Sequence, residues 1–70
     1  MNSEEKKRMA EIKSLLIISN KEDIPLFISF NDRSEKTGVV KMIDQFFRVF
    51  FINDVGYSPK DIVEIELAGV

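Results

Sequence analysis

The chain has 70 residues, which is enough for one small domain, residues 1–70. It contains no cysteine and no histidine, so disulfides, Cys/His metal clusters and histidine-assisted nucleophiles are excluded. The net charge is −2 and the charged residues of both signs are interspersed, which disfavours nucleic-acid binding by phosphate neutralisation.

The N-terminal segment has the pattern of an amphipathic helix. Asn2 or Ser3 can cap its first turn. The apolar residues recur at helical spacing and form one stripe: Met9, Ile12, Leu15 and Leu16. Asn20 is a plausible left-handed stop, and Pro25 prevents an uninterrupted helix beyond it. The sequence therefore predicts a helix over residues 3–19.

After Pro25 the pattern changes to short segments rich in β-forming residues. Five strands are predicted, over residues 26–30, 39–43, 46–52, 55–58 and 62–67. The polar segment 31–38 is expected to be a loop, Asn53-Asp54 a turn, and residues 59–61 a single 3₁₀ turn because Pro59 fixes φ. This layout predicts a mainly β fold, an N-terminal α-helix followed by a five-stranded SH3/Sm-like small barrel over residues 26–67.

Two sequence motifs resemble a known family. The run from Gly38 to Asp44, GVVKMID, resembles the "G-x-I-x-K-I-D" element of the YolD-like proteins of Gram-positive bacteria and their mobile elements. The segment from Ser58 to Leu67 resembles the "f-x-D-I-x-x-I-E" close of that family. The resemblance covers about residues 10–67 and depends on the order and spacing of the motifs. It departs from the family pattern at Pro59, where an aromatic is usual, and at Phe46-Phe47, where polar turn residues are common.

The resemblance implies a small Sm-like barrel that binds another protein. Genes of such proteins often neighbour those of Y-family error-prone DNA polymerases, which suggests an accessory or regulatory role in DNA-damage tolerance. A homo-oligomer is a further expectation from the size of the domain, because a shared interface would help so small a core.

The residues offer little support for catalysis, and no cofactor or metal is expected. Glu64 and Glu66 alternate on one face of a predicted strand and could form a carboxylate pair. A solvated outer face opposite Val63, Ile65 and Leu67 explains the same spacing. The chain lacks the D-x-D-x-D-G spacing of a calcium loop. We therefore expect a protein that is not an enzyme.

The predicted strand over residues 46–52 carries apolar residues on both faces. Phe47, Val49 and Phe51 share one face, and the opposite face includes Arg48. Arg48 favours that opposite face as the outer one, whereas the resemblance places Phe50 and Ile52 inside. Two interpretations stay open for the first face: burial under the N-terminal helix, or an exposed patch that binds another protein or a second copy of the chain. Phe47, Val49 and Phe51 are accordingly the candidate partner-binding residues.

Two other functions stay open. An Sm-like nucleic-acid-binding protein could use the cationic residues of the helix, although the positions that carry Asn and Arg-Gly in RNA-binding Sm proteins differ here. An inhibitor of a host enzyme, encoded by a mobile element, is the other alternative. The polar N-terminus and the short apolar runs predict a cytoplasmic protein without a signal peptide or membrane span.

Overall fold

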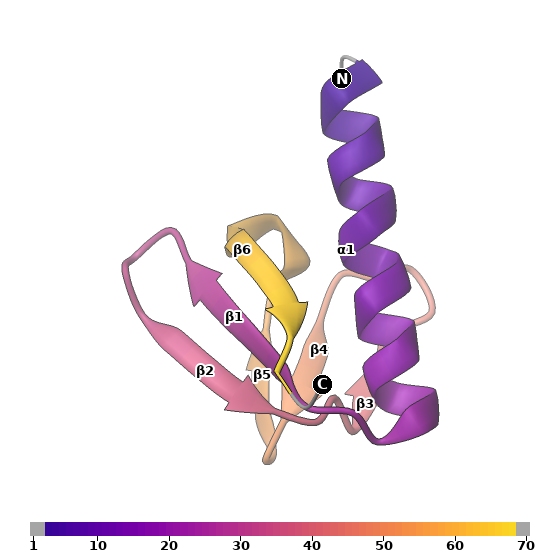
Figure 1. Ribbon diagram of the computed structural model, residues 1–70, viewed down its shortest axis with the longest axis vertical. Coiled ribbons are helices and arrows are strands. Elements are labelled where there is room, and N and C mark those ends of the chain that lie inside the picture. The colour runs from indigo at the N-terminus through magenta and orange to yellow at the C-terminus, as the bar shows by residue number, and fades with distance from the viewer. Residues whose placement is uncertain (1–2, 69–70) are drawn as a thin grey trace.

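The computed structural model describes residues 3–68, which form one helix, six strands and a 3₁₀ turn (Figure 1). The elements are α1 Ser3–Glu22, β1 Leu26–Phe30, β2 Glu35–Gly38, β3 Met42–Ile43, β4 Phe50–Ile52, β5 Val55–Tyr57, η1 Pro59–Asp61 and β6 Ile62–Leu67. The described part of the chain is therefore a mixed α/β domain rather than the mainly β fold predicted. Asn2, one of the two candidate caps, lies outside the described residues.

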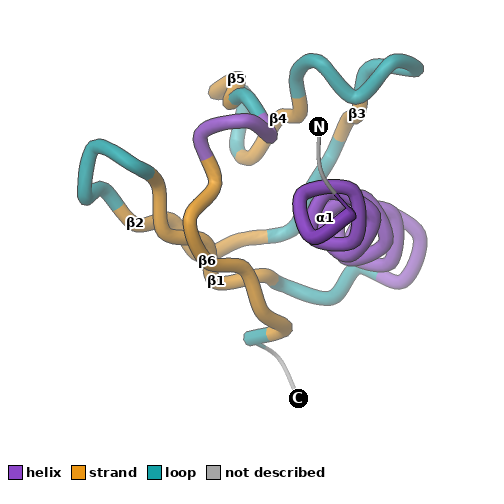
Figure 2. Tube along the Cα trace, turned by 90° about the horizontal axis from the view of Figure 1, so that it is seen from above, coloured by secondary structure: helices purple, strands orange, loops and turns teal. Residues whose placement is uncertain are grey.

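The strands form two antiparallel sheets, not one closed five-stranded barrel. The strand orders are β2-β1-β6 and β3-β4-β5, and no strand pairing joins the two sheets within residues 3–68. Figure 2 shows the two sheets facing each other, with α1 along one side. The predicted barrel is wrong because the backbone between β2 and β3 pairs with side chains of the helix and does not continue the strand pairing. There the N–H of Val40 donates to Ser19 Oγ (3.0 Å), and its carbonyl accepts from Asn20 Nδ2 (3.0 Å).

The helix is longer than predicted and packs on the sheets. It continues to Glu22, and Asp23 ends it in the left-handed region (φ 55°), so Asn20 is not the stop. Ile12, Leu16 and Ser19 are its buried residues. The register of its apolar stripe was predicted correctly. The Ser19 hydroxyl adds a buried hydrogen bond from the N–H of Val40, between β2 and β3, that the apolar pattern does not contain.

Strand boundaries differ from prediction in the middle of the chain. Residues 35–38 were expected in a loop but form β2, an edge strand whose side chains are mostly exposed and therefore show no apolar alternation. The predicted strands 39–43 and 46–52 shrink to β3 and β4. The predicted turn at Asn53-Asp54 is confirmed, because both residues have positive φ (51° and 68°) and join β4 to β5.

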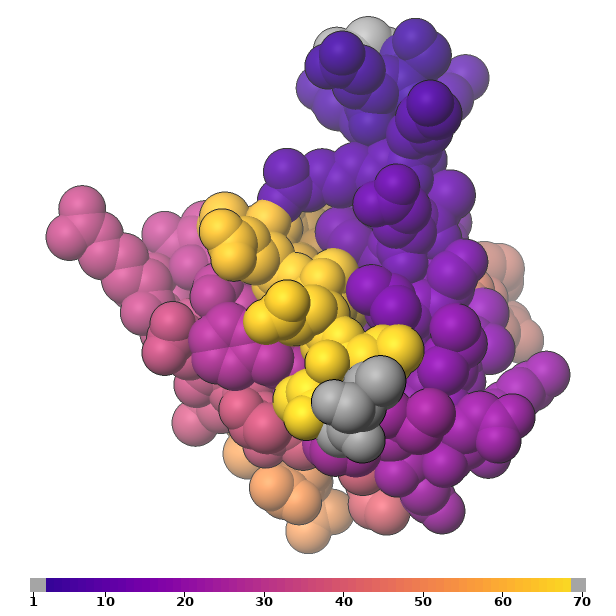
Figure 3. Space-filling model, in the orientation of Figure 1, coloured from indigo at the N-terminus to yellow at the C-terminus, as the bar shows by residue number. Residues whose placement is uncertain are grey.

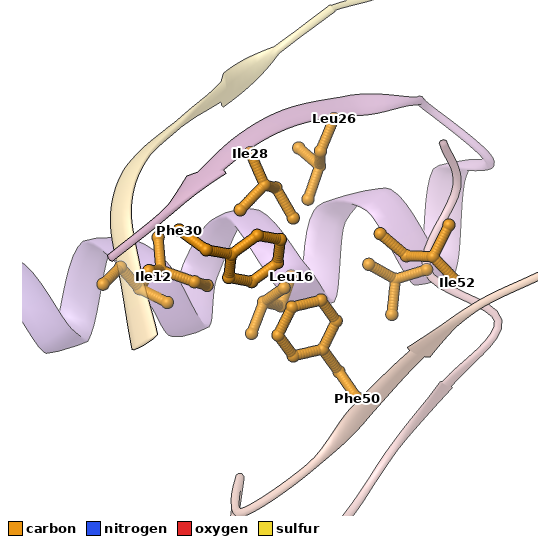
Figure 4. Packing of buried hydrophobic residues seen from close by; sticks show 9 residues of the cluster. Ile12, Leu16, Leu26, Ile28, Phe30, Phe50 and Ile52 are labelled. Atoms are coloured by element: carbon orange, nitrogen blue, oxygen red, sulfur yellow. The ribbon is translucent and has the colours of Figure 1, made fainter. Parts of the chain in front are cut away.

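The core lies between the two sheets and is closed by the helix (Figure 4). Its buried apolar residues come from α1, β1, β4 and β6, with Val40 from the segment between β2 and β3: Ile12, Leu16, Leu26, Ile28, Phe30, Val40, Phe50, Ile52 and Ile62. Tyr57 connects the sheets by stacking on Phe30 of β1 (ring centroids 5.1 Å apart) and by a tilted contact with Phe50 of β4 (5.7 Å). The core thus depends on contacts between segments distant in sequence.

A bulge alters the predicted face of β6. The pairing of β1 with β6 shifts between Ser29 and Phe30, so that Phe30 lies opposite Ile62. Ile62 therefore takes the core position, and Val63, predicted to share the inner face with Ile65 and Leu67, is 44% exposed. The freed carbonyl of Val63 accepts a hydrogen bond from the Arg8 guanidinium, which ties the helix to this edge.

Candidate functional site

The outer surface of the sheet β3-β4-β5 is apolar. Met42, Phe51 and Gly56 lie opposite one another across its three strands, and Val49 is two residues before Phe51. The neighbouring row, which includes Phe50, faces the core. Met42 is 61% exposed, whereas Val49 and Phe51 are partly buried. We call the surface made by Met42, Val49, Phe51 and Gly56 the outer face.

Gly56 explains how the outer face is packed. A Cβ at this position would lie 3.1 Å from a Phe51 ring atom and 3.2 Å from Val49 Cγ2. The absence of a side chain at Gly56 therefore lets the Phe51 ring and Val49 lie close to the backbone of β5. A side chain at position 56 would displace one of these two residues.

The structure separates the three predicted partner-binding residues. Val49 and Phe51 come together on the outer face, but Phe47 does not join them. Phe47 lies in the turn before β4 with a φ of 56°, packs against the core, and receives the Lys13 ammonium 5.3 Å from its ring centroid. Phe47 lies beside the helix, whereas Val49 and Phe51 lie on the outer face and are partly buried, so the three residues do not share one face as predicted.

Asp44 shapes the turn that removes Phe47 from the strand. Its Oδ2 accepts hydrogen bonds from the N–H groups of Phe46 (3.1 Å) and Arg48 (3.3 Å), and from Arg48 Nε (3.3 Å). Its own N–H donates to the Val49 carbonyl (2.9 Å). Such local side-chain bonds compete with strand pairing, so the apolar run 46–52 does not form one strand. The Arg48 guanidinium then lies over the Phe46 ring, 5.1 Å from its centroid.

Asp44 should make stability depend on acid pH. Partial burial would raise the pKa of its carboxyl, but the hydrogen bonds from Arg48 and Phe46 outweigh that effect and hold the pKa below its usual value. The stabilisation is therefore complete above the unfolded pKa of about 3.9 and is lost as pH falls through the lower folded value. We expect Asp44→Asn to lower Tm at neutral pH and the difference from wild type to narrow below about pH 4. Thermal unfolding followed by circular dichroism, at several pH values from neutral to acid, measures the two Tm values. A Tm difference between wild type and Asp44→Asn that does not change with pH would contradict the prediction.

A second surface lies between the helix and the turn 44–48. A groove of about 350 Å³ is bounded by the N-terminal half of α1, this turn and η1. The lining side chains that give it its character are Met9, Lys13, Phe46, Phe47, Arg48 and Lys60. Phe46 is 65% exposed. We call this surface the basic groove. The sequence signals for it were the departures from the family pattern at Phe46-Phe47 and at Pro59, both of which line the groove, and the cationic residues of the helix. Nothing in the sequence indicated that these segments come together.

Other candidate sites find no support among the described residues. No group of three or more acidic side chains within residues 3–68 could hold a metal ion. Glu64 and Glu66 are both exposed on β6, as a solvated strand face requires. No helix in the described part of the chain is both long and apolar enough to cross a membrane. Comparisons with protein-family models, curated proteins and solved structures found no match.

Proposed function

We propose that this chain is a non-catalytic module that binds another protein through its outer face. The observation that carries the proposal is the row Met42–Phe51–Gly56, which is apolar across all three strands although the core lies on the other side of the sheet. When one face of an antiparallel sheet packs on the core and the other meets only water, the residues on the water-facing side are normally polar. Met42 in this row is 61% exposed, and Phe51 and the nearby Val49 are partly exposed. Exposed apolar surface marks interaction sites in small proteins.

The proposed partner is a Y-family DNA polymerase, which the protein would regulate in DNA-damage tolerance. This part of the proposal rests on the resemblance of Gly38–Asp44 and Ser58–Leu67 to the YolD-like motifs. A second copy of the chain is the alternative occupant of the outer face.

The test uses Phe51→Asp in a binding measurement with a purified Y-family polymerase from the same organism. An aspartate would have to be buried in an apolar interface, so we expect affinity to fall at least about tenfold. Val55→Asp is the matched control, because Val55 is 51% exposed but lies opposite Ile52, away from the outer face. Surface plasmon resonance with immobilised wild-type and variant chains gives the dissociation constants.

The possible failures separate the parts of the proposal. If the wild-type chain does not bind the polymerase, the polymerase is not the partner. A pull-down from cell lysate followed by mass spectrometry would then be used to identify another one. Equal affinity of wild type and Phe51→Asp for the polymerase would show that the outer face is not the binding surface. If Phe51→Asp does not fold, Met42→Asp replaces it, since a side chain that is 61% exposed contributes little to the core.

A further inference from the structure

The basic groove has a charge that the rest of the molecule does not share. Three cationic side chains, Lys13, Arg48 and Lys60, line it, and none of its lining residues is acidic. The whole chain, by contrast, carries a net charge of −2. Within the described residues, neither Lys13 nor Lys60 forms an ion pair. The groove is therefore a local positive site on an acidic protein.

Its walls also offer apolar surface next to these charges. Phe46 is 65% exposed, and Met9 lines the same groove from α1. The thioether side chain of methionine is flexible and adapts to different apolar partners. Asp44, the nearest carboxylate along the turn, already accepts the hydrogen bonds of Phe46 and Arg48 and so is committed to holding the turn. Apolar and cationic groups thus lie side by side on a turn with a defined shape.

The helix forms one wall of the groove through Met9 and Lys13. The N-terminal half of α1 projects beyond the sheets (Figures 1 and 3). From Ser3 to Arg8 every residue is exposed, and Ile12 is the first buried one. The hydrogen bond from Arg8 to Val63 and the contact of Lys13 with Phe47 hold this half in place. The wall is therefore present before any ligand binds, which reduces the entropy lost on binding.

We propose that the basic groove binds a short acidic segment of another protein, with an apolar side chain between Met9 and Phe46 and carboxylates facing Lys13, Arg48 and Lys60. The inference deepens the proposed function by naming the chemistry of a partner segment, at a surface separate from the outer face. Charge complementarity identifies the occupant, because Lys13 and Lys60 form no ion pair within the described residues and Arg48 pairs only with Asp44 of its own turn.

A single-stranded nucleic acid fits the groove less well. Such ligands need an electropositive channel over several nucleotides and open aromatic faces on which bases stack. Here Arg48 covers one face of Phe46, Lys13 covers one face of Phe47, and the groove spans about 350 Å³.

The experiment titrates the full chain into a peptide of about eight residues, fluorescein-Glu-Asp-Glu-Leu-Phe-Glu-Asp-Glu-amide, labelled on its N-terminal amine and roughly 26 Å long when extended. Fluorescence anisotropy at low salt measures binding. The control peptide replaces every Glu and Asp by Gln and Asn. We expect saturable binding of the acidic peptide and at least tenfold weaker binding of the control peptide. As the salt concentration rises, the affinity for the acidic peptide should fall, and so should its advantage over the control peptide.

Two charge-reversal variants locate the site. Lys13→Glu/Lys60→Glu is expected to weaken peptide binding at least tenfold. The matched control, Lys21→Glu/Lys36→Glu, changes the net charge by the same amount at exposed lysines outside the groove and should change binding less than threefold. All four lysines are exposed, so both variants should fold, which circular dichroism checks.

Each contrary result has a distinct meaning. An equal loss in the two variants, or no peptide binding by wild type, would overturn the inference, and polymerase binding retained by the same protein would leave the proposed function standing. Loss of peptide binding in Phe51→Asp but not in Lys13→Glu/Lys60→Glu would move the peptide to the outer face. Tighter binding of an oligothymidylate than of the acidic peptide would replace the protein segment by nucleic acid and also overturn the inference.

Discussion

Replacing Phe50 with alanine is expected to lower the free energy of unfolding by about 3–5 kcal/mol. Phe50 is completely buried, and its ring contacts Tyr57, which itself stacks on Phe30 of the other sheet. Truncation would leave a cavity where the two sheets meet. A domain of this size has a total stability of roughly 4–10 kcal/mol, so the variant should be close to unfolded at room temperature. Urea denaturation followed by circular dichroism measures the change.

The neighbouring phenylalanine is the control for this prediction. Phe51 follows Phe50 directly but lies on the outer face, where it is only partly buried. We expect Phe51→Ala to cost about 1 kcal/mol, several times less than Phe50→Ala. Equal losses would mean that both faces of β4 belong to the core, and the outer face would then lose its role as a binding surface.

Replacing Leu16 with alanine is expected to cost about 2–5 kcal/mol. Leu16 is fully buried and joins α1 to the core between the sheets. Ile17 is the matched control, because it is adjacent and 37% exposed, and alanine favours the helix. Ile17→Ala should therefore change stability by less than about 1 kcal/mol.

Two signals show whether helix and sheets unfold together. Circular dichroism at about 222 nm reports mainly on α1, and the fluorescence of Tyr57, the single tyrosine of the chain, reports on the contact between the sheets. In wild type and in Leu16→Ala we expect both signals to change at the same urea concentration, as in a two-state transition. Loss of the helix signal before the Tyr57 signal would show that α1 docks on sheets that fold without it.

A pattern of apolar residues can identify the segment that forms a candidate surface without predicting how its side chains are arranged. The run from Phe46 to Ile52 looks like one continuous strand, and alternation then assigns Phe47, Val49 and Phe51 to one face. The Asp44 carboxylate instead holds the first half in a turn. Phe47 consequently rotates toward α1, and only Val49 and Phe51 keep the predicted relationship. A hydrogen bond from the backbone to a side chain cannot be predicted from the spacing of apolar residues.

Several elements were decided by the sequence alone, because their causes are local. The stripe of Ile12 and Leu16, the strands β1 and β6, the turn at Asn53-Asp54 and the 3₁₀ turn at Pro59 follow from spacing within a few residues and from backbone preferences. The absence of cysteine and histidine likewise limits the chemistry open to the chain.

The tertiary structure alone decided the division into two sheets, the edge strand β2 and the basic groove. Each depends on groups far apart in the sequence: Ser19 and Asn20 take the hydrogen bonds of Val40, β1 gives polar Glu35–Gly38 a partner, and Lys13 meets Phe47. Such contacts form only when folding brings the segments together. No local period of apolar residues encodes them.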